Sequence, residues 1–125
     1  MKVFISVDIE GITTTSNWDE CDNEHSTYGV QAEQMTKEVL AVCEGAIAAG
    51  AKEIYVRDAH DTGCNIDPFK MPKEVILIRS WSGCPKSMAE GIDESFDAAM
   101  FVGYHAATTR PGNPLSHTIS SANIR

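Results

Sequence analysis

Residues 2–11 of the chain read KVFISVDIEG, an apolar run that ends in two acids one position apart. The run KVFISV is rich in β-branched and aromatic residues and alternates little, which is typical of a strand covered on both faces in a parallel sheet. Side chains at positions i and i+2 of a strand project to the same face, so Asp8 and Glu10 can reach one point. Two neighbouring carboxylates at a buried strand end repel each other, and a metal cation is the natural counter-charge. The stretch therefore predicts a parallel α/β fold and raises the hypothesis of a metal site.

The segments that follow predict how the sheet is built. Apolar positions recur at three- and four-residue steps over residues 30–49, which predicts an amphipathic helix with Gly50 as its C-cap. A strand at residues 53–57 would complete a βαβ unit whose two strands run parallel. Further elements are expected as strands at residues 74–78 and 98–103, a short helix at 86–91 and a candidate last strand around 118–121. We expect a three-layer α/β/α fold with a mostly parallel sheet, formed by residues 1–125 as one domain, with ligands at the carboxyl ends of the strands.

Composition and charge narrow the class of protein. Hydrophobic residues make up 42% of the chain and charged residues 22%, as in soluble globular domains. The 18 acids and 10 bases give a formal net charge of −8, which disfavours a nucleic-acid binder because such proteins need a basic face. The four cysteines include no CxxC pair and are expected to be free thiols. Because there is also no signal-peptide pattern and no apolar run long enough to cross a bilayer, we expect a cytoplasmic protein without nucleic-acid or membrane partners.

Polar residues that can bind metals follow three of the expected strands. In an open parallel sheet, ligands bind outside the carboxyl ends of the strands, so these residues should converge on one crevice. The candidates are Asp8 and Glu10, Asp58 and His60, and His105. Mixed carboxylate and imidazole ligands favour a divalent transition metal, zinc first and manganese or cobalt as alternatives, over calcium or magnesium. With a bridging carboxylate, the set could hold two ions about 3.5–4 Å apart.

Each of these signals has an ordinary explanation when it is taken alone. An Asp-x-Glu sequence after a strand is usually a turn or a helix cap, and a lone histidine usually makes ordinary hydrogen bonds. His25 lies in an acidic loop and is expected only to be solvated. His117 lies in the loop PLSHT, where it could be a general acid or base, a nucleophile or an ordinary loop residue. Trp18 and Trp81 are expected to pack in the fold or to line a pocket.

Five short motifs, taken together, resemble those of a known family. They are SVDIEG at 6–11, Asp58-x-His60, SMAEGID at 87–93, FVGYHA at 101–106 and Ser116-His117-Thr118. In this order and at this spacing they resemble the zinc-dependent D-aminopeptidases encoded with bacterial dipeptide transporters, and the similarity runs through essentially the whole chain. The resemblance implies a metallopeptidase with two zinc ions that releases amino-terminal D-residues, such as D-alanine, from short peptides. It also implies assembly as a homo-oligomeric ring.

The resemblance also implies a role for individual residues. Asp8 corresponds to the carboxylate that bridges both zinc ions, and three further ligands correspond to Glu10, His60 and His105. His117 corresponds to the catalytic histidine, as either nucleophile or proton shuttle. Family members are considerably longer, and the resemblance implies a further glutamate ligand beyond Arg125. We therefore expect the chain to represent either the amino-terminal half of the family fold or a natural short form.

Two other classes of protein remain open from the residues alone. A receiver- or flavodoxin-like domain also gathers acids at strand ends, in that case around magnesium. Such a domain needs an acid after its third strand, where this sequence has Arg79 and Ser80, and no glycine-rich phosphate loop follows any expected strand. The other class is a truncated or degenerate relative that binds metal without catalysis and serves in assembly. Metal content and peptide hydrolysis separate these classes.

Overall fold

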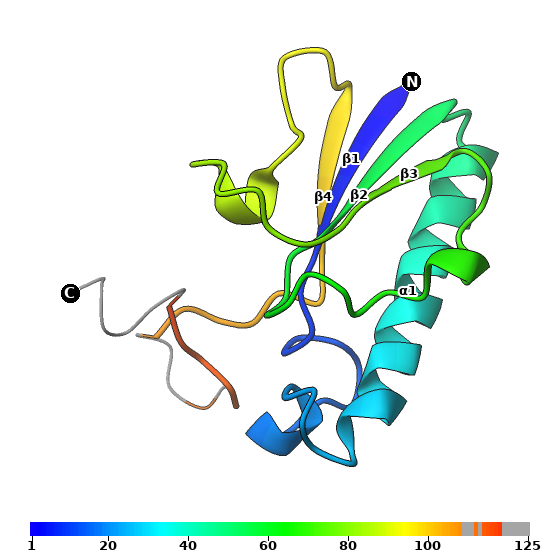
Figure 1. The fold of residues 1–125 in the computed structure, drawn as a ribbon. Coiled ribbons are helices and arrows are strands. Elements are labelled where there is room, and N and C mark those ends of the chain that lie inside the picture. Colours follow the sequence, from blue (N-terminus) through cyan, green and yellow to red (C-terminus); the bar gives the residue numbers. More distant parts are fainter. Residues whose placement is uncertain (109–111, 113, 119–125) are drawn as a thin grey trace.

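The computed structural model describes residues 1–108, 112 and 114–118 (Figure 1). Its elements, in which η marks a 3-10 turn, are β1 (Lys2–Val7), η1 (Trp18–Glu20), α1 (Tyr28–Ala48), β2 (Glu53–Asp58), η2 (Pro68–Lys70), β3 (Val75–Ile78), η3 (Ser87–Ala89) and β4 (Ala98–Val102). The four strands and the long helix lie where the sequence predicts them, whereas the helix expected at 86–91 is only η3. The candidate strand around 118–121 lies outside the described residues apart from Thr118. In the described part of the chain, no helix is both long and apolar enough to cross a membrane.

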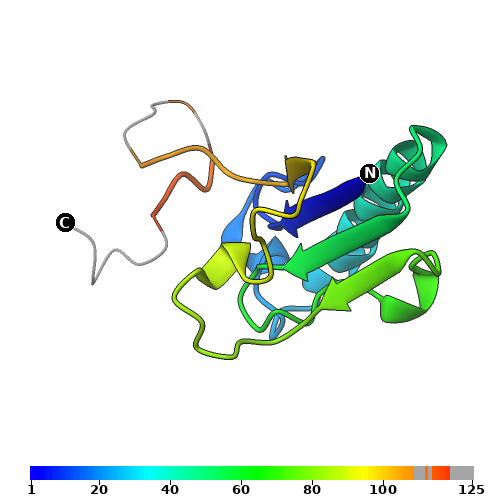
Figure 2. The same cartoon turned by 90° about the horizontal axis from the view of Figure 1, so that it is seen from above.

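The four strands form one parallel sheet in the order β3-β2-β1-β4. β1 lies in the interior of the sheet, and its last residue, Val7, pairs with Asp58 of β2 and Val102 of β4. Figure 2 shows strands side by side with their arrowheads pointing the same way. Because β1 is buried along nearly its whole length, its apolar sequence is continuous rather than alternating. The expected parallel α/β class is confirmed, and the carboxyl ends of β1, β2 and β4 lie level with one another.

α1 covers one face of the sheet (Figure 1). Its buried apolar positions recur at three- and four-residue steps, at Met35, Val39, Cys43 and Ala46. These side chains share a hydrophobic core with every second residue of β1 from Val3 to Val7. Full burial of one aliphatic side chain of this kind contributes about 1.5–3 kcal/mol. The helix therefore holds β1 and β2 together from one side and fixes where their ends lie.

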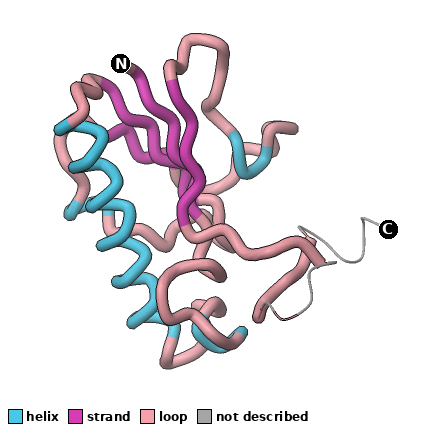
Figure 3. The backbone as a smooth tube through the Cα atoms, turned by 180° about the vertical axis from the view of Figure 1, so that it is seen from behind, coloured by secondary structure: helices cyan, strands magenta, loops and turns pink. Residues whose placement is uncertain are grey.

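The other face of the sheet is covered by η3 and the loops beside it (Figure 3). Phe4 is fully buried on this face and packs edge-on against Phe96. The segment after β3 contains Pro85 and turns at Gly91, whose φ is +99°, and it forms one 3-10 turn between them. Within the described residues, the third layer of the α/β/α fold is thus a loop with a single 3-10 turn in place of the short helix expected at 86–91.

Two glycines bring the loops after β1 and β4 into backbone contact. The backbone N–H of Gly11 donates to the carbonyl of Gly103 (2.7 Å), and that of Asp8 donates to Val102 (2.9 Å). A Cβ atom at Gly11 would collide with the carbonyl oxygen of Tyr104, and one at Gly103 with the carbonyl oxygen of Asp8. Gly103 also has a φ of +67°, in the region that favours glycine. This close approach places the polar residues after β1 beside those after β4.

Candidate metal centre

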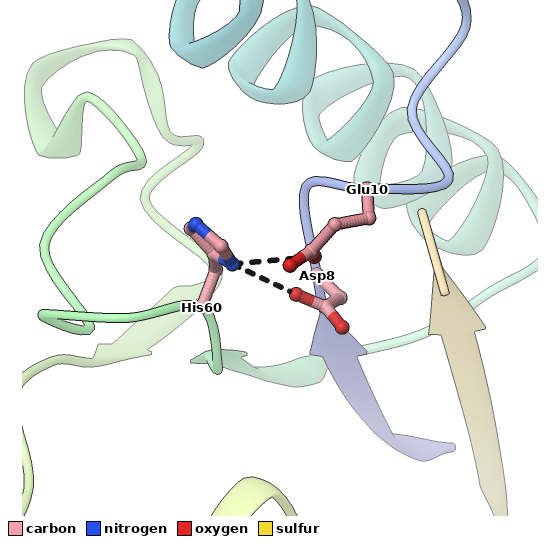
Figure 4. A group of neighbouring side chains, drawn as sticks. All are labelled: Asp8, Glu10 and His60. Atoms are coloured by element: carbon pink, nitrogen blue, oxygen red, sulfur yellow. Dashed lines mark hydrogen bonds and ion pairs between the residues drawn. The ribbon is translucent and has the colours of Figure 1, made fainter. Parts of the chain in front are cut away.

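Asp8, Glu10 and His60 meet at the carboxyl ends of β1 and β2 (Figure 4). All three are buried, with 3%, 7% and 8% of their surfaces exposed. Nδ1 of His60 lies 3.1 Å from Oδ1 of Asp8 and 3.2 Å from Oε2 of Glu10. One ligand atom from each residue lies within 4.8 Å of the other two. The structure thus brings together three of the residues that the sequence proposes as ligands.

Asp58 has a different role from the one considered for it. Its carboxylate accepts hydrogen bonds from the backbone N–H groups of Asn65 and Ile66 and from the side-chain amide of Asn65, at 2.6 to 2.8 Å. The same amide donates to the carbonyl of His60 (2.7 Å). The expected pairing of Asp58 with His60 fails because β2 ends at Asp58, and the alternation of a strand does not continue into the turn that follows. Asp58 therefore shapes the loop that carries His60 and lies outside the cluster.

His105 and His117 lie beside the two carboxylates. Nε2 of His105 is 3.7 Å from Oδ2 of Asp8, and Nε2 of His117 is 3.8 Å from Oε1 of Glu10. The two imidazole rings stack, with their centroids 3.7 Å apart and their planes inclined by 22°. His25 stands apart: about half of its side chain is exposed, and its ring nitrogens face Asp19 and Asp22 at 3.7 and 3.8 Å.

Each of the three imidazoles beside the carboxylates has one nitrogen against a backbone carbonyl. Nε2 of His60 lies 2.7 Å from the carbonyl oxygen of Cys21. Nδ1 of His105 lies 2.9 Å from that of Ala106, and Nδ1 of His117 lies 2.7 Å from that of Leu115. We assign the N–H to these nitrogens because only an N–H satisfies a carbonyl. The second nitrogen of each ring is then left facing the carboxylates, the arrangement that orients histidines as metal ligands.

The charges of the three clustered groups depend on one another. Burial raises the pKa of the Asp8 carboxyl, and the neighbouring Glu10 adds to this effect. Burial would also raise the pKa of Glu10, but the contacts of its carboxylate with His60 and Asp8 prevail and lower it to about 2. Burial would lower the pKa of His60, but its contacts with the same two acids prevail and raise it to about 10. His60 as an imidazolium, with a proton on both ring nitrogens, offsets one of the two negative charges, and a divalent cation that replaced the proton on Nδ1 would offset both.

The donor set fits a divalent transition metal. Oε2 of Glu10 is sealed from solvent and makes no hydrogen bond of good geometry within the described part of the chain. It shares Nδ1 of His60 with Asp8, and one N–H proton cannot satisfy both oxygens. Buried oxygens without a partner are unfavourable unless a proton or a cation serves them. Carboxylate oxygens with imidazole nitrogens are donors typical of zinc and its neighbours.

The site opens into a cleft of about 380 Å³. Besides the acids and imidazoles already described, the cleft is lined by Ala59, Asp61, Trp81, Ser87 and Met88. Trp81 is therefore a pocket-wall residue, one of the two roles expected for it, while Trp18 packs edge-on against His117.

Sequence reasoning missed the carbonyl of Cys21, which orients His60. No side-chain pattern could have identified it, because every residue has a carbonyl.

The fold and the site together define a parallel α/β protein with a carboxylate and imidazole centre suited to a divalent metal. The family model described as D-aminopeptidase matches residues 1–125, and the chain belongs to this family. We therefore set aside the receiver- or flavodoxin-like interpretation. The chain belongs to another family, and its strand order is 3-2-1-4 rather than the flavodoxin-like 2-1-3-4-5.

Comparisons with Bacillus subtilis illustrate the similarity, one by sequence and one by structure. A D-aminopeptidase of strain 168 is 35% identical over 119 residues, which cover 95% of this chain and 43% of that protein. The solved structure of the Zn-dependent D-aminopeptidase DppA, described as a self-compartmentalizing protease, matches with a TM-score of 0.90 and 33% identity. That match covers 96% of this chain and 43% of the solved chain. This chain thus spans less than half the length of the matched protein and of the solved chain.

Proposed function

We propose that this chain carries the zinc site of an aminopeptidase that hydrolyses short peptides with amino-terminal D-residues, such as D-alanine. The observation that carries the proposal is the arrangement of three imidazoles, each with one nitrogen against a backbone carbonyl and the other facing Asp8 or Glu10. Family membership and the Zn-dependent relative support the choice of activity and of metal. Manganese and cobalt suit the same donors and are the alternatives.

The ligands of this proposal are Asp8, Glu10, His60 and His105. The two oxygens of Asp8 face different imidazoles, Oδ1 facing His60 at 3.1 Å and Oδ2 facing His105 at 3.7 Å. A carboxylate that faces two imidazoles in this way is suited to bridge two ions, which is the role we propose for Asp8. Zinc held by these residues would supply Lewis-acid chemistry, in which the scissile carbonyl is polarised and the pKa of a bound water is lowered.

His117 is the catalytic residue of this proposal. Its Nδ1–H is held by the carbonyl of Leu115, so Nε2 is the atom that can accept a proton or attack a carbonyl carbon. Its side chain is 27% exposed, compared with 5% for Glu10, so it is more accessible to a substrate in the cleft. The ring of Trp18 packs edge-on against it and restricts its movement. The chain can therefore hold a proton acceptor at the rim of the metal centre.

The cellular setting and the assembly are also proposals. The four cysteines are free thiols, which suits the reducing cytoplasm. The DppA structure is described as self-compartmentalizing, and we propose that this protein likewise assembles with copies of itself, as a ring. We propose short peptides with D-residues as its partners, and neither nucleic acid nor membrane.

Hydrolysis of D-Ala-D-Ala and of L-Ala-L-Ala by the zinc-loaded chain, with and without a chelator, tests the proposal. We expect release of D-alanine that the chelator abolishes and added zinc restores, and little release from the L-dipeptide. The metal content should be measured in the same preparation. A folded, zinc-loaded chain that hydrolyses neither dipeptide would instead support a relative that binds metal without catalysis.

A further inference from the structure

Trp81 forms one wall of the cleft and is held there from several sides. It follows β3, and 42% of its surface is exposed. The guanidinium carbon of Arg57 lies 4.1 Å from the centroid of its indole, and its Nε1–H donates to the carbonyl of Asp61, the residue after His60. An exposed tryptophan fixed by a stacked cation and a hydrogen bond presents a rigid apolar surface to the cleft.

The guanidinium of Arg57 is buried with few hydrogen-bond partners, which favours its stacking on Trp81. Its side chain is fully buried, Nη1 donates to the carbonyl of Ser80 (2.6 Å), and Nη1 lies 3.7 Å from Oε2 of Glu90. Its Nε and Nη2 have no hydrogen-bond partner among the described residues. A buried guanidinium with so few partners is unfavourable, whereas a planar cation stacked on an indole gains a cation–π interaction. The stack on Trp81 is thus a principal contact of this group.

The backbone ties the segment that carries Trp81 to the loop that carries His60. The N–H of Ser80 donates to the carbonyl of Gly63 (2.9 Å), and the N–H of Gly63 donates to the carbonyl of His60 (2.8 Å). Ser80 and Gly63 both have positive φ angles, +59° and +66°. A Cβ atom at Gly63 would lie 2.9 Å from the backbone nitrogen of Ser80. The position of the indole is therefore coupled to that of a proposed metal ligand.

The chemistry of the cleft gives Trp81 a function. Most of the lining is charged or polar, and its apolar members are Ala59, Trp81 and Met88. Trp81 is by far the largest of them, and flat aromatic walls are typical places for the apolar part of a ligand. We propose that the indole of Trp81 contacts the apolar side chain next to the scissile bond and limits its size, and that Arg57 is the positioning residue that holds the indole. This inference rests on the proposed function and adds a determinant of substrate choice to it.

The first test compares Trp81→Ala with Phe69→Ala, which removes a 97% exposed aromatic residue that does not line the cleft. We expect Trp81→Ala to retain bound zinc and to raise KM for D-Ala-D-Ala more than it lowers kcat. We also expect the preference for D-Ala-D-Ala over D-Leu-D-Ala to fall about tenfold, the usual order of discrimination by an apolar wall. Phe69→Ala should keep the wild-type preference.

The second test does not depend on turnover. In a Trp18→Phe variant, Trp81 is the remaining tryptophan, and free D-alanine, which has no peptide bond, serves as the probe. We expect D-alanine to change the emission of Trp81 until binding saturates. Adding Arg57→Lys retains the charge but removes the planar group, so the emission should shift to longer wavelength and the response to D-alanine should weaken several-fold.

The outcomes separate this inference from the proposed function. If the wild-type chain hydrolyses D-Ala-D-Ala, while Trp81→Ala keeps the wild-type preference and D-alanine leaves the emission of Trp81 unchanged, the inference is wrong and the proposed function stands. If the zinc-loaded wild-type chain hydrolyses neither D-Ala-D-Ala nor D-Leu-D-Ala, the proposed function is wrong and the inference fails with it.

Discussion

The imidazole rings of His105 and His117 stack with their centroids 3.7 Å apart, and each turns Nε2 toward a different carboxylate. His105 faces Asp8 and His117 faces Glu10, so a proposed ligand and the proposed catalytic residue share one wall of the site. Because the two histidines differ in their exposure to solvent and in the carboxylates that they face, the role of each can be tested by replacing one residue at a time.

Replacing Asp8 should strongly weaken metal binding. Asp8→Ala removes the carboxylate that faces both His60 and His105, and even partners that only orient a ligand change metal affinity about 10–100-fold. We expect a loss of zinc affinity of at least this size, measured by competition with a chromophoric chelator. Asp61→Asn, which changes another carboxylate of the cleft outside the cluster, is the matched control. Retention of zinc by Asp8→Ala would remove Asp8 from the ligand set.

Replacing His117 should lower turnover without loss of bound zinc, unlike the replacement of Asp8. His117→Ala leaves Asp8, Glu10 and His60 in place, so zinc content should stay near the wild-type value. Turnover of D-Ala-D-Ala should fall about 10²–10⁴-fold, because a group that transfers a proton in the transition state is lost. The measurements are zinc content and kcat on the same sample. A variant that loses zinc and keeps turnover when reloaded would show that His117 is a ligand rather than the catalytic group.

Replacing Gly103 should destabilise the fold at the site. Gly103→Ala forces a Cβ atom against the carbonyl of Asp8 at a φ of +67°, and strain of this kind costs about 1–3 kcal/mol. We expect the free energy of unfolding in urea to fall by at least this amount. Gly45→Ala, inside α1 with no atom within 4 Å of the added Cβ, should instead stabilise the chain by about 0.5–1 kcal/mol. Equal effects of the two substitutions would mean that the two loops do not approach each other as described.

Thiol reactivity should follow burial. Cys43 lies in the core, where burial raises the pKa of its thiol to about 11, whereas Cys64 is exposed. Because the thiolate is the reactive form, Ellman's reagent at pH 8 should modify Cys64 at least about 100-fold faster than Cys43. Single variants, Cys43→Ser and Cys64→Ser, assign the two rates. Fast modification of Cys43 in the folded chain would contradict the packing of α1 on the sheet.

Much of the fold could be predicted because its signals are local. The continuous apolar sequence of β1 and the three- and four-residue steps of α1 indicate their structures directly, and their bounds differ from the expected ones by at most two residues. The second face of the sheet was harder to predict. Ser87 and Gly91, inside the expected helix at residues 86–91, have positive φ angles of +48° and +99°, so a right-handed α-helix does not run through them.

Part of the site could be predicted from the topology of a parallel sheet. Asp8, Glu10 and His60 meet because parallel strands end at one edge, which is a consequence of topology. Asp58 was placed with them by the alternation of a strand, but the strand ends there and its carboxylate instead binds Asn65 and Ile66. Such partners depend on loop conformation, which hydrophobic patterning does not describe.

Anomalous diffraction at the zinc absorption edge, from crystals of the zinc-loaded chain, tests the central claim most directly. We expect an anomalous peak at about 2.0–2.2 Å from carboxylate oxygens of Asp8 and Glu10 and from Nδ1 of His60, the usual distances for zinc. Nε2 of His105 should lie at a similar distance from this peak or from a second one that shares Asp8. A zinc-loaded crystal with its peak elsewhere, or with the three side chains paired only with one another, would contradict the account.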